Sequence, residues 1–149
     1  MVQGRASGIS LFNQLQKLEQ NLDLLRDDVL KGLADEIVVR SPVDSGAYVR
    51  SHTVEVGRSA GGQFTGNLQS NPTSANPEAE RELGRAKMYA EIDALPKEAV
   101  QVSFNNRVPH ASKVEYSGWS TTEPYMVYKG AASRYPAILQ EVKNRLGLK

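Results

Sequence analysis

Two stretches decide how this sequence folds: SPVDSGAYVRS at residues 41–51 and VPHASKVEYSG at residues 108–118. In the first, Asp44 and Ser45 can hydrogen-bond nearby backbone N–H groups, and Gly46 tolerates a positive φ, so this stretch predicts a turn. In the second, a short helix is expected to begin at Pro109 and to close at Gly118. Neither stretch holds a recognisable catalytic set. We therefore interpret both as turns and element starts that hold a small domain together.

A long amphipathic helix is predicted before the first stretch. Its apolar residues recur in alternating steps of four and three, and they are Leu11, Leu15, Leu18, Leu22, Leu25 and Val29. This is the helical period, and Ser10 and Pro42 are the expected N-cap and stop signal. At 1.5 Å per residue the helix would measure roughly 45 Å, longer than the ~38 Å diameter of a compact domain of this size. The stripe could pack entirely on the domain's own sheet, or Leu18, Leu22 and Leu25 could also contact a neighbouring subunit.

The remaining sequence predicts a small sheet and further helices. Strands are expected at residues 47–57 and 99–104, the second with Val100, Val102 and Phe104 facing inward and a turn at 105–106 after it. Asn76 or Thr73 would cap a second helix that begins at Pro77. A last helix is expected from Pro124, with a kink or break at Pro136. The predicted fold class is therefore α+β: a small antiparallel sheet packed by a long N-terminal helix and a C-terminal helix, with a long loop or hairpin insert.

The insert is a neutral segment at residues 58–76. It holds one charged side chain, and Phe64 and Leu68 are its only large apolar groups, so it cannot bury much surface. We expect an extended arm whose Phe64 and Leu68 contact another subunit or ring. Residues 1–9 are expected to form a flexible N-terminal arm, and residues 10–149 a single domain.

Composition excludes several classes of protein. The chain has 149 residues, 40% of them hydrophobic, which is enough for one globular domain with a core. No apolar run approaches the ~20 residues that span a bilayer, so we expect no membrane partner. The absence of cysteine excludes disulfides, thiolate catalysis and cysteine-ligated zinc.

Charge is balanced overall but uneven along the chain. The formal net charge is +1, whereas residues 124–149 carry five basic residues against Glu141, a local net of +4. Four of the basic residues are Lys129, Arg134, Lys143 and Arg145. They could form a solvated helix face, or a surface that faces DNA or a partner protein. The acidic residues Glu78, Glu80, Glu82, Glu91 and Asp93 are expected on the solvated face of the second helix.

Side chains for catalysis or for a cofactor are sparse. The two histidines, His52 and His110, are expected to be half-buried or interfacial, and an arrangement of either with Asp44 and Ser45 or Ser112 lacks a supporting motif. No metal-ligand spacing and no phosphate-binding glycine pattern occur in the sequence. We therefore expect no enzymatic activity, no metal and no cofactor.

At residues 41–51 and 108–118 the sequence resembles the HK97 gp10-like phage protein family. SPVDSGAYVRSHTVEVG looks like the family's P-V-D-T-G-x-L-R-x-S hallmark, and VSFNNRVPHASKVEYSG resembles its N-x-x-P-Y-A-x-x-x-E-Y-G segment. The closing YPAILQEVKNR is similar to the family's C-terminal helix, and the order of elements agrees over residues 10–146. Ser45 stands where the family usually has threonine, His110 where it has tyrosine, and Ser117 separates Tyr116 from Gly118. These departures keep turn and packing roles.

The resemblance implies a structural part of a tailed-phage virion. Family members are described as head–tail joining, tail-completion or tail-terminator proteins. A ring of six or twelve copies would connect the portal-proximal adaptor with the tail tube or tail terminator. Packaged DNA would pass through the ring without sequence-specific binding, and assembly would take place in the host cytoplasm. Asp44, Ser45, Gly46, Pro109, Glu115, Tyr116 and Gly118 would then serve as turn and framework residues.

Three alternatives remain open at this point. Within the same class, the chain could be a tail terminator that caps the tail tube. From a different class, it could be a nucleic-acid-binding module that uses the basic C-terminal segment. A hydrolase built on a histidine is the third.

Overall fold

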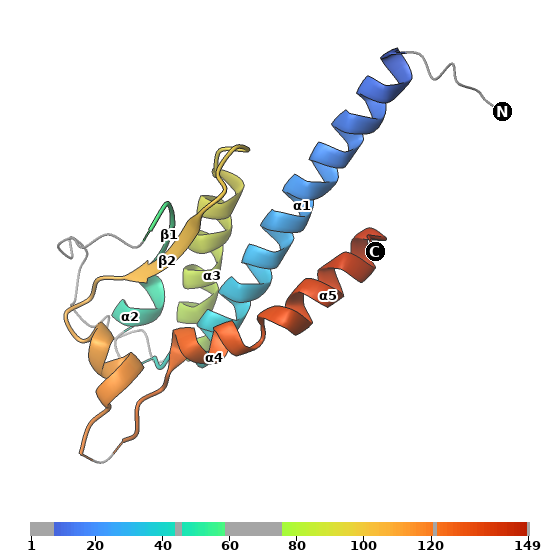
Figure 1. Ribbon diagram of the computed structural model, residues 1–149. Helices are drawn as coiled ribbons and strands as arrows, with labels where there is room; N and C mark the ends of the chain where they lie inside the picture. The colour runs from blue at the N-terminus through green and yellow to red at the C-terminus, as the bar shows by residue number, and fades with distance from the viewer. Residues whose placement is uncertain (1–7, 44–45, 59–75, 121, 149) are drawn as a thin grey trace.

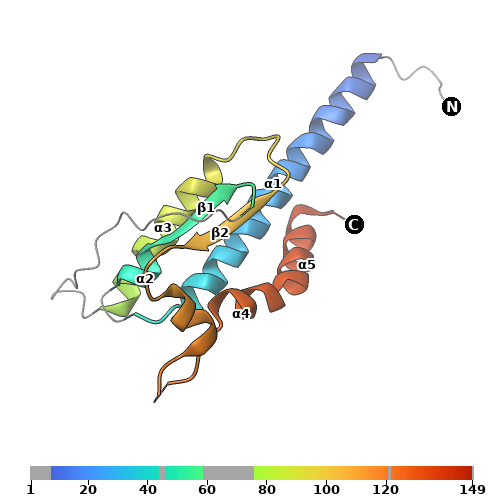
Figure 2. The same cartoon turned by 60° about the vertical axis from the view of Figure 1, so that its left-hand side comes forward.

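The computed structural model describes residues 8–43, 46–58, 76–120 and 122–148, and it confirms the α+β fold class. The long helix α1 (Gly8–Arg40) and α3 (Pro77–Asp93) pack behind a two-stranded antiparallel sheet of β1 (His52–Val56) and β2 (Val102–Asn106) (Figures 1 and 2). The C-terminal helices α4 (Val127–Ser133) and α5 (Tyr135–Leu146) pack along α1. Two short elements complete the order: α2 (Ala47–Arg50) before β1, and the π-helix η1 (Lys113–Ser117) before α4.

The sheet is shorter than predicted at both strands. Residues 47–50 form α2 instead of the start of a strand, because the N–H of Arg50 donates to the carbonyl of Gly46 at 3.1 Å. The second strand begins at Val102, so Val100 is fully exposed rather than inward. Residues 105–106, predicted as a turn, pair with β1, and the register sets His52 opposite Asn106 and Val54 opposite Phe104.

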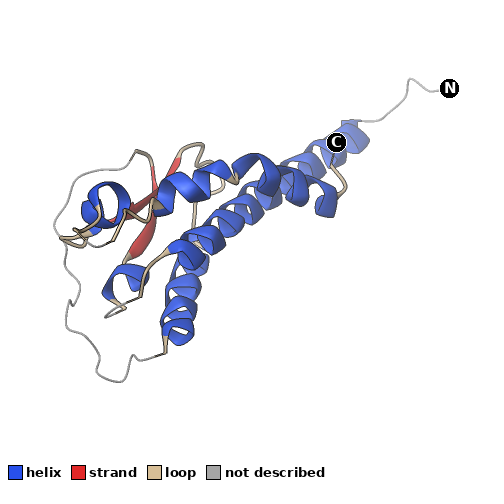
Figure 3. Cartoon of the chain, turned by 90° about the horizontal axis from the view of Figure 1, so that it is seen from below, coloured by secondary structure: helices blue, strands red, loops and turns tan. Residues whose placement is uncertain are grey.

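α1 extends beyond the rest of the molecule at its N-terminal end (Figures 1 and 3). It begins at Gly8, so Ser10 lies inside the helix and is not its N-cap, and it ends at Arg40 before Pro42 as predicted. Only its C-terminal half takes part in the main core. That core gathers buried residues from α1, α2, β1, α3 and α4, among them Val38, Val49, Val54, Met88, Ile92 and Val127.

A second, smaller core joins α1 to α5. Val29 of α1 packs with Ile138 and Val142 of α5, and Leu25, Leu33, Leu139 and Leu146 surround them. Gly32 lets the two helices approach closely, because a Cβ atom there would lie 2.6 Å from Cγ2 of Ile138. The predicted break at Pro136 is confirmed: α4 ends at Ser133, Arg134 interrupts the helix, and α5 follows.

α3 begins as the sequence predicts. The side chain of Asn76 accepts hydrogen bonds from the N–H groups of Glu78 (3.1 Å) and Ala79 (3.3 Å), and Pro77 occupies the first turn. Thr73, the alternative cap, lies outside the described residues. Further along, Gly84 faces α2, and a Cβ atom there would collide with the carbonyl oxygen of Val49.

Candidate functional site

The last residue of α2, Arg50, is joined to α3 by an ion pair that lies beside the turn at Gly46. Gly46 has a φ of 84°, which favours glycine, and a Cβ atom there would collide with Oε2 of Glu80. The same oxygen lies 2.6 Å from Nε of Arg50. Glu80 is 5% exposed, so its predicted place on a solvated face is wrong, whereas Glu78, Glu82 and Asp93 are exposed. The turn residues Asp44 and Ser45 lie outside the described residues.

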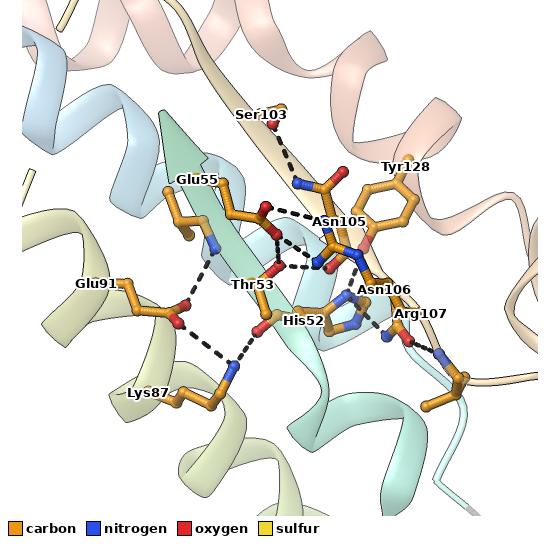
Figure 4. Close-up of polar contacts among 12 residues, drawn as sticks. His52, Thr53, Glu55, Lys87, Glu91, Ser103, Asn105, Asn106, Arg107 and Tyr128 are labelled. Atoms are coloured by element: carbon orange, nitrogen blue, oxygen red, sulfur yellow. Dashed lines mark hydrogen bonds and ion pairs between the residues drawn. The ribbon is translucent and has the colours of Figure 1, made fainter. Parts of the chain in front are cut away.

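His52 is the centre of a buried hydrogen-bond network. It is 1% exposed rather than half-buried, its Nε2 lies 2.8 Å from the hydroxyl of Ser41, and its Nδ1 lies 2.7 Å from the hydroxyl of Tyr128. Asn106 Nδ2 approaches the same Nδ1 at 3.3 Å and donates to the carbonyl of Tyr48 at 2.8 Å. The network therefore ties the end of α1 to both strands, α2 and α4. Figure 4 shows His52 with its partners Asn106 and Tyr128.

The partners fix the tautomer of His52. Ser41 donates its hydroxyl hydrogen to the carbonyl of Ile37 at 2.6 Å, so it can only accept a hydrogen bond from His52. The ring proton is then on Nε2, and Nδ1 accepts the hydroxyl of Tyr128. Burial, and secondly the charge of Lys87, lower the pKa of His52 to about 3, so the ring is neutral near pH 7.

The distance between Ser41 and His52 matches that of a catalytic serine and its base, but the chemistry differs. The proton of Ser41 is held by a backbone carbonyl, and both side chains are 1% exposed, so a substrate cannot reach them. This pair therefore stabilises the fold. The arrangement considered and set aside from the sequence used Ser45 or Ser112, and no sequence pattern indicates Ser41 or Tyr128.

Side chains of α3 occupy the outer edge of β1. Lys87 donates to the carbonyl of His52 at 2.6 Å, and Glu91 accepts the N–H of Val54 at 3.1 Å. The spacing of Lys87 and Glu91 by four residues places them on one face of α3. Their contacts satisfy backbone groups that an edge strand otherwise presents to other chains.

A bidentate ion pair crosses the sheet (Figure 4). Arg107, directly after β2, donates to the two carboxylate oxygens of Glu55 in β1 at 2.6 and 2.9 Å. The hydroxyl of Thr53 donates to the same carboxylate at 2.5 Å. The hydrogen bonds from Arg107, and then from Thr53, lower the pKa of Glu55 to about 2.

Glu115 links the second stretch to the last helices. It is 4% exposed, and its carboxylate accepts the N–H groups of Tyr128 (2.7 Å) and Lys129 (3.1 Å) in the first turn of α4. The residue at the N-cap position, Met126, makes no capping hydrogen bond with its side chain. A carboxylate at a helix N-terminus also interacts favourably with the helix dipole.

The other residues of the second stretch divide between buried and exposed positions. Gly118 has a φ of 63°, and a Cβ atom there would collide with the carbonyl oxygen of Thr122. Tyr116 is 77% exposed and Pro109 is exposed, so neither packs into the framework as predicted. His110 is half-buried and, with Tyr48, Trp119 and Tyr125, lines a hollow of about 200 Å³ between the two stretches.

The N-terminal part of α1 carries exposed leucines. We name residues 13–22 the overhang; in it Leu15 is 61% exposed, and Leu18 and Leu22 are each 52% exposed. Leu25 differs, because it packs against the core shared with α5. Phe64 and Leu68, the other predicted contact residues, lie outside the described residues.

The basic C-terminal residues are partly paired with acids. Arg134 lies 3.6 Å from both Glu36 and Glu141, and Arg145 lies 3.3 Å from Asp28. Lys129 is exposed and Lys143 is half-buried. Two of the four candidate basic residues thus have acidic partners within the chain, which reduces the positive charge that they present to DNA.

Within the described ranges, no group of three or more histidine, aspartate or glutamate side chains could hold a metal ion. The helices of the same ranges include none that is long and apolar enough to cross a membrane. Comparison with protein-family models gives no match. Searches of curated proteins and of solved structures likewise find no match.

Proposed function

We propose that this protein is a structural virion subunit of a tailed bacteriophage, a ring-forming neck or tail-completion protein. In this role a ring of six or twelve copies links the portal-proximal adaptor to the tail tube or tail terminator. The observation that carries the proposal is the overhang. A helix that leaves the domain and exposes leucines at helical spacing is expected to bury them against another chain.

The contacts made by residues 41–51 and 108–118 support a structural role. Gly46 and Gly118 have positive φ angles, and Glu115 caps a helix. These are the positions through which the sequence resembles the HK97 gp10-like family. Their contacts lie inside the domain, so they hold a scaffold in shape for assembly.

Packaged DNA would pass through such a ring without sequence-specific contacts. Lys129 is one exposed basic residue that could face the DNA or a neighbouring protein. If the chain were instead a nucleic-acid-binding module, its affinity for duplex DNA would fall steeply with salt, with a slope set by the number of phosphates contacted. We expect weak binding with a shallow slope, because Arg134 and Arg145 already have acidic partners.

Electron microscopy of the purified protein, with mass photometry of the same sample, tests the proposal. Rings with sixfold or twelvefold symmetry, and a mass that is the matching multiple of 16.4 kDa, are expected. Electron microscopy of phage particles with an antibody against the chain should label the neck or the head-proximal end of the tail. A protein that remains monomeric at high concentration and is absent from particles would contradict the proposal.

A further inference from the structure

A second apolar surface lies beside α1, and it is a groove. Two adjoining hollows of about 460 and 450 Å³ share Leu33, Phe104 and Tyr135 as lining residues. Their other apolar lining includes Leu25 of α1, Leu139 of α5 and Val100 before β2. We name this surface the groove; α1 runs between the sheet and α5 along it (Figures 1 and 2).

We infer that the groove receives the overhang of a second copy of this chain. The inference rests on the proposed function, because it names the contact by which copies would associate. Leu15, Leu18 and Leu22 stand at positions i, i+3 and i+7, the spacing with which an amphipathic helix places its apolar side chains in a hydrophobic groove. The two hollows, of about 460 and 450 Å³, give the groove room for such side chains.

Continuity of the apolar surface points to a copy of the same chain. The leucines of α1 form one apolar stripe. Leu25 and Leu33 pack on α5, whereas Leu15 and Leu18 continue the stripe beyond the end of α5 and are exposed. Leu22 belongs both to the overhang and to the lining of the groove. Every copy therefore offers a helix with exposed leucines and, next to it, an apolar groove, in equal numbers.

A basic helix borders the groove, and an acidic residue follows the overhang. The overhang itself carries Lys17 against Glu19, a net of zero, and Asp23 comes directly after it. α5 carries Lys143 and Arg145 against Glu141, a net of +1. Lys143 follows Leu139 by four residues, so it lies one turn further along the face of α5 that lines the groove. An incoming overhang would thus bring Glu19, and Asp23 directly after it, toward Lys143, whereas Arg145 already pairs with Asp28 of its own chain.

The test uses one variant for each surface and a matched control. The overhang variant is Leu15→Gln with Leu18→Gln, and the groove variant is Val100→Glu, at a side chain that is fully exposed. Leu83→Gln on α3 is the control, because Leu83 is 58% exposed, close to the values of the overhang leucines. All three are expected to keep the circular dichroism spectrum and melting temperature of the unsubstituted protein.

Analytical ultracentrifugation measures the association of each variant. We expect the overhang and groove variants each to associate at least about ten-fold more weakly than the unsubstituted protein, and the control to associate normally. A mixture of the overhang and groove variants should recover a hetero-complex, since the groove variant keeps its overhang and the overhang variant keeps its groove. Normal association of either variant alone, or no recovery in the mixture, would overturn the inference.

Cross-linking gives a direct readout of proximity. The chain has no cysteine, so in a mixture of Leu18→Cys and Val100→Cys chains every cross-link joins two introduced residues. We expect a cross-linked dimer of the two different chains in the mixture, and its absence would count against the inference. Rings that still form from the overhang and groove variants would refute this contact and leave the proposed function standing. A closed dimer held by this contact, without rings, would support the contact and refute the ring.

Discussion

The Nδ1 atom of His52 accepts the hydroxyl hydrogen of Tyr128 over 2.7 Å, and this bond joins β1 to α4. It depends on a neutral imidazole, because a protonated ring would turn Nδ1 into a donor. Nε2 already donates to Ser41, so protonation would bury a charge, force the bond with Tyr128 to reverse and set the new Nδ1 proton against the amide donor of Asn106.

Acidification is expected to destabilise the fold through His52. Its pKa is about 3 in the folded chain and 6.5 ordinarily, so between these values the unfolded chain binds the extra proton. The free energy of unfolding therefore has its full value above about pH 6.5. It decreases as the pH falls, by up to about 1.4 kcal/mol per pH unit. Urea unfolding between about pH 5 and pH 7 measures it. A flat profile for the unsubstituted protein would contradict the prediction.

Removal of the Glu115 carboxylate is expected to loosen α4. Glu115→Ala leaves the N–H groups of Tyr128 and Lys129 without their acceptor, which should cost about 1–3 kcal/mol of unfolding free energy. Glu115→Gln keeps one acceptor oxygen and should cost less. Chemical denaturation measures both, with Glu123→Ala, at an exposed position, as a control expected within about 0.5 kcal/mol of the unsubstituted protein. Equal stability of Glu115→Ala and the control would argue against the cap.

Local patterns in the sequence predicted much of the fold. The leucine spacing predicted α1, Asn76 and Pro77 predicted the start of α3, and Pro136 predicted the break before α5. Each of these signals acts within one or two turns of its own helix. The α+β fold class followed from their order along the chain.

The errors arose where distant residues decide the local structure. Glu80 is buried because Arg50, thirty positions earlier, pairs with it across the α2–α3 contact. Residues 47–50 alternate like a strand but form α2, which packs against α3 where Gly84 leaves room. The partners of His52 come from positions 41, 106 and 128, and no pattern in the sequence connects them.

A side chain at Gly84 is expected to separate α2 from α3. The Cβ atom of Gly84→Ala would collide with the carbonyl oxygen of Val49, at a cost of about 1–3 kcal/mol. This opposes the gain of about 1 kcal/mol in helix propensity from glycine to alanine. Thermal unfolding should show a lower melting temperature for Gly84→Ala, and little change for Ala86→Ser at an exposed position of α3. A higher melting temperature for Gly84→Ala would show that the helices can move apart without loss.

Arg107 is expected to keep Glu55 ionised in acid. The hydrogen bonds of Arg107 and Thr53 lower the pKa of Glu55 from 4.5 to about 2, so the pair stabilises the fold above about pH 4.5 and loses this effect as the pH falls toward 2. Carboxyl carbon shifts in an NMR titration report this pKa directly. Arg107→Gln should raise it toward 4.5, because the largest stabilising partner of the carboxylate is lost, while Thr53 still donates one hydrogen bond. Arg58→Gln removes an exposed positive charge just beyond β1 and should leave the titration of Glu55 nearly unchanged. If both variants raised the pKa of Glu55 equally, the low pKa would be due to the general positive charge near the sheet rather than to the bidentate contact with Arg107.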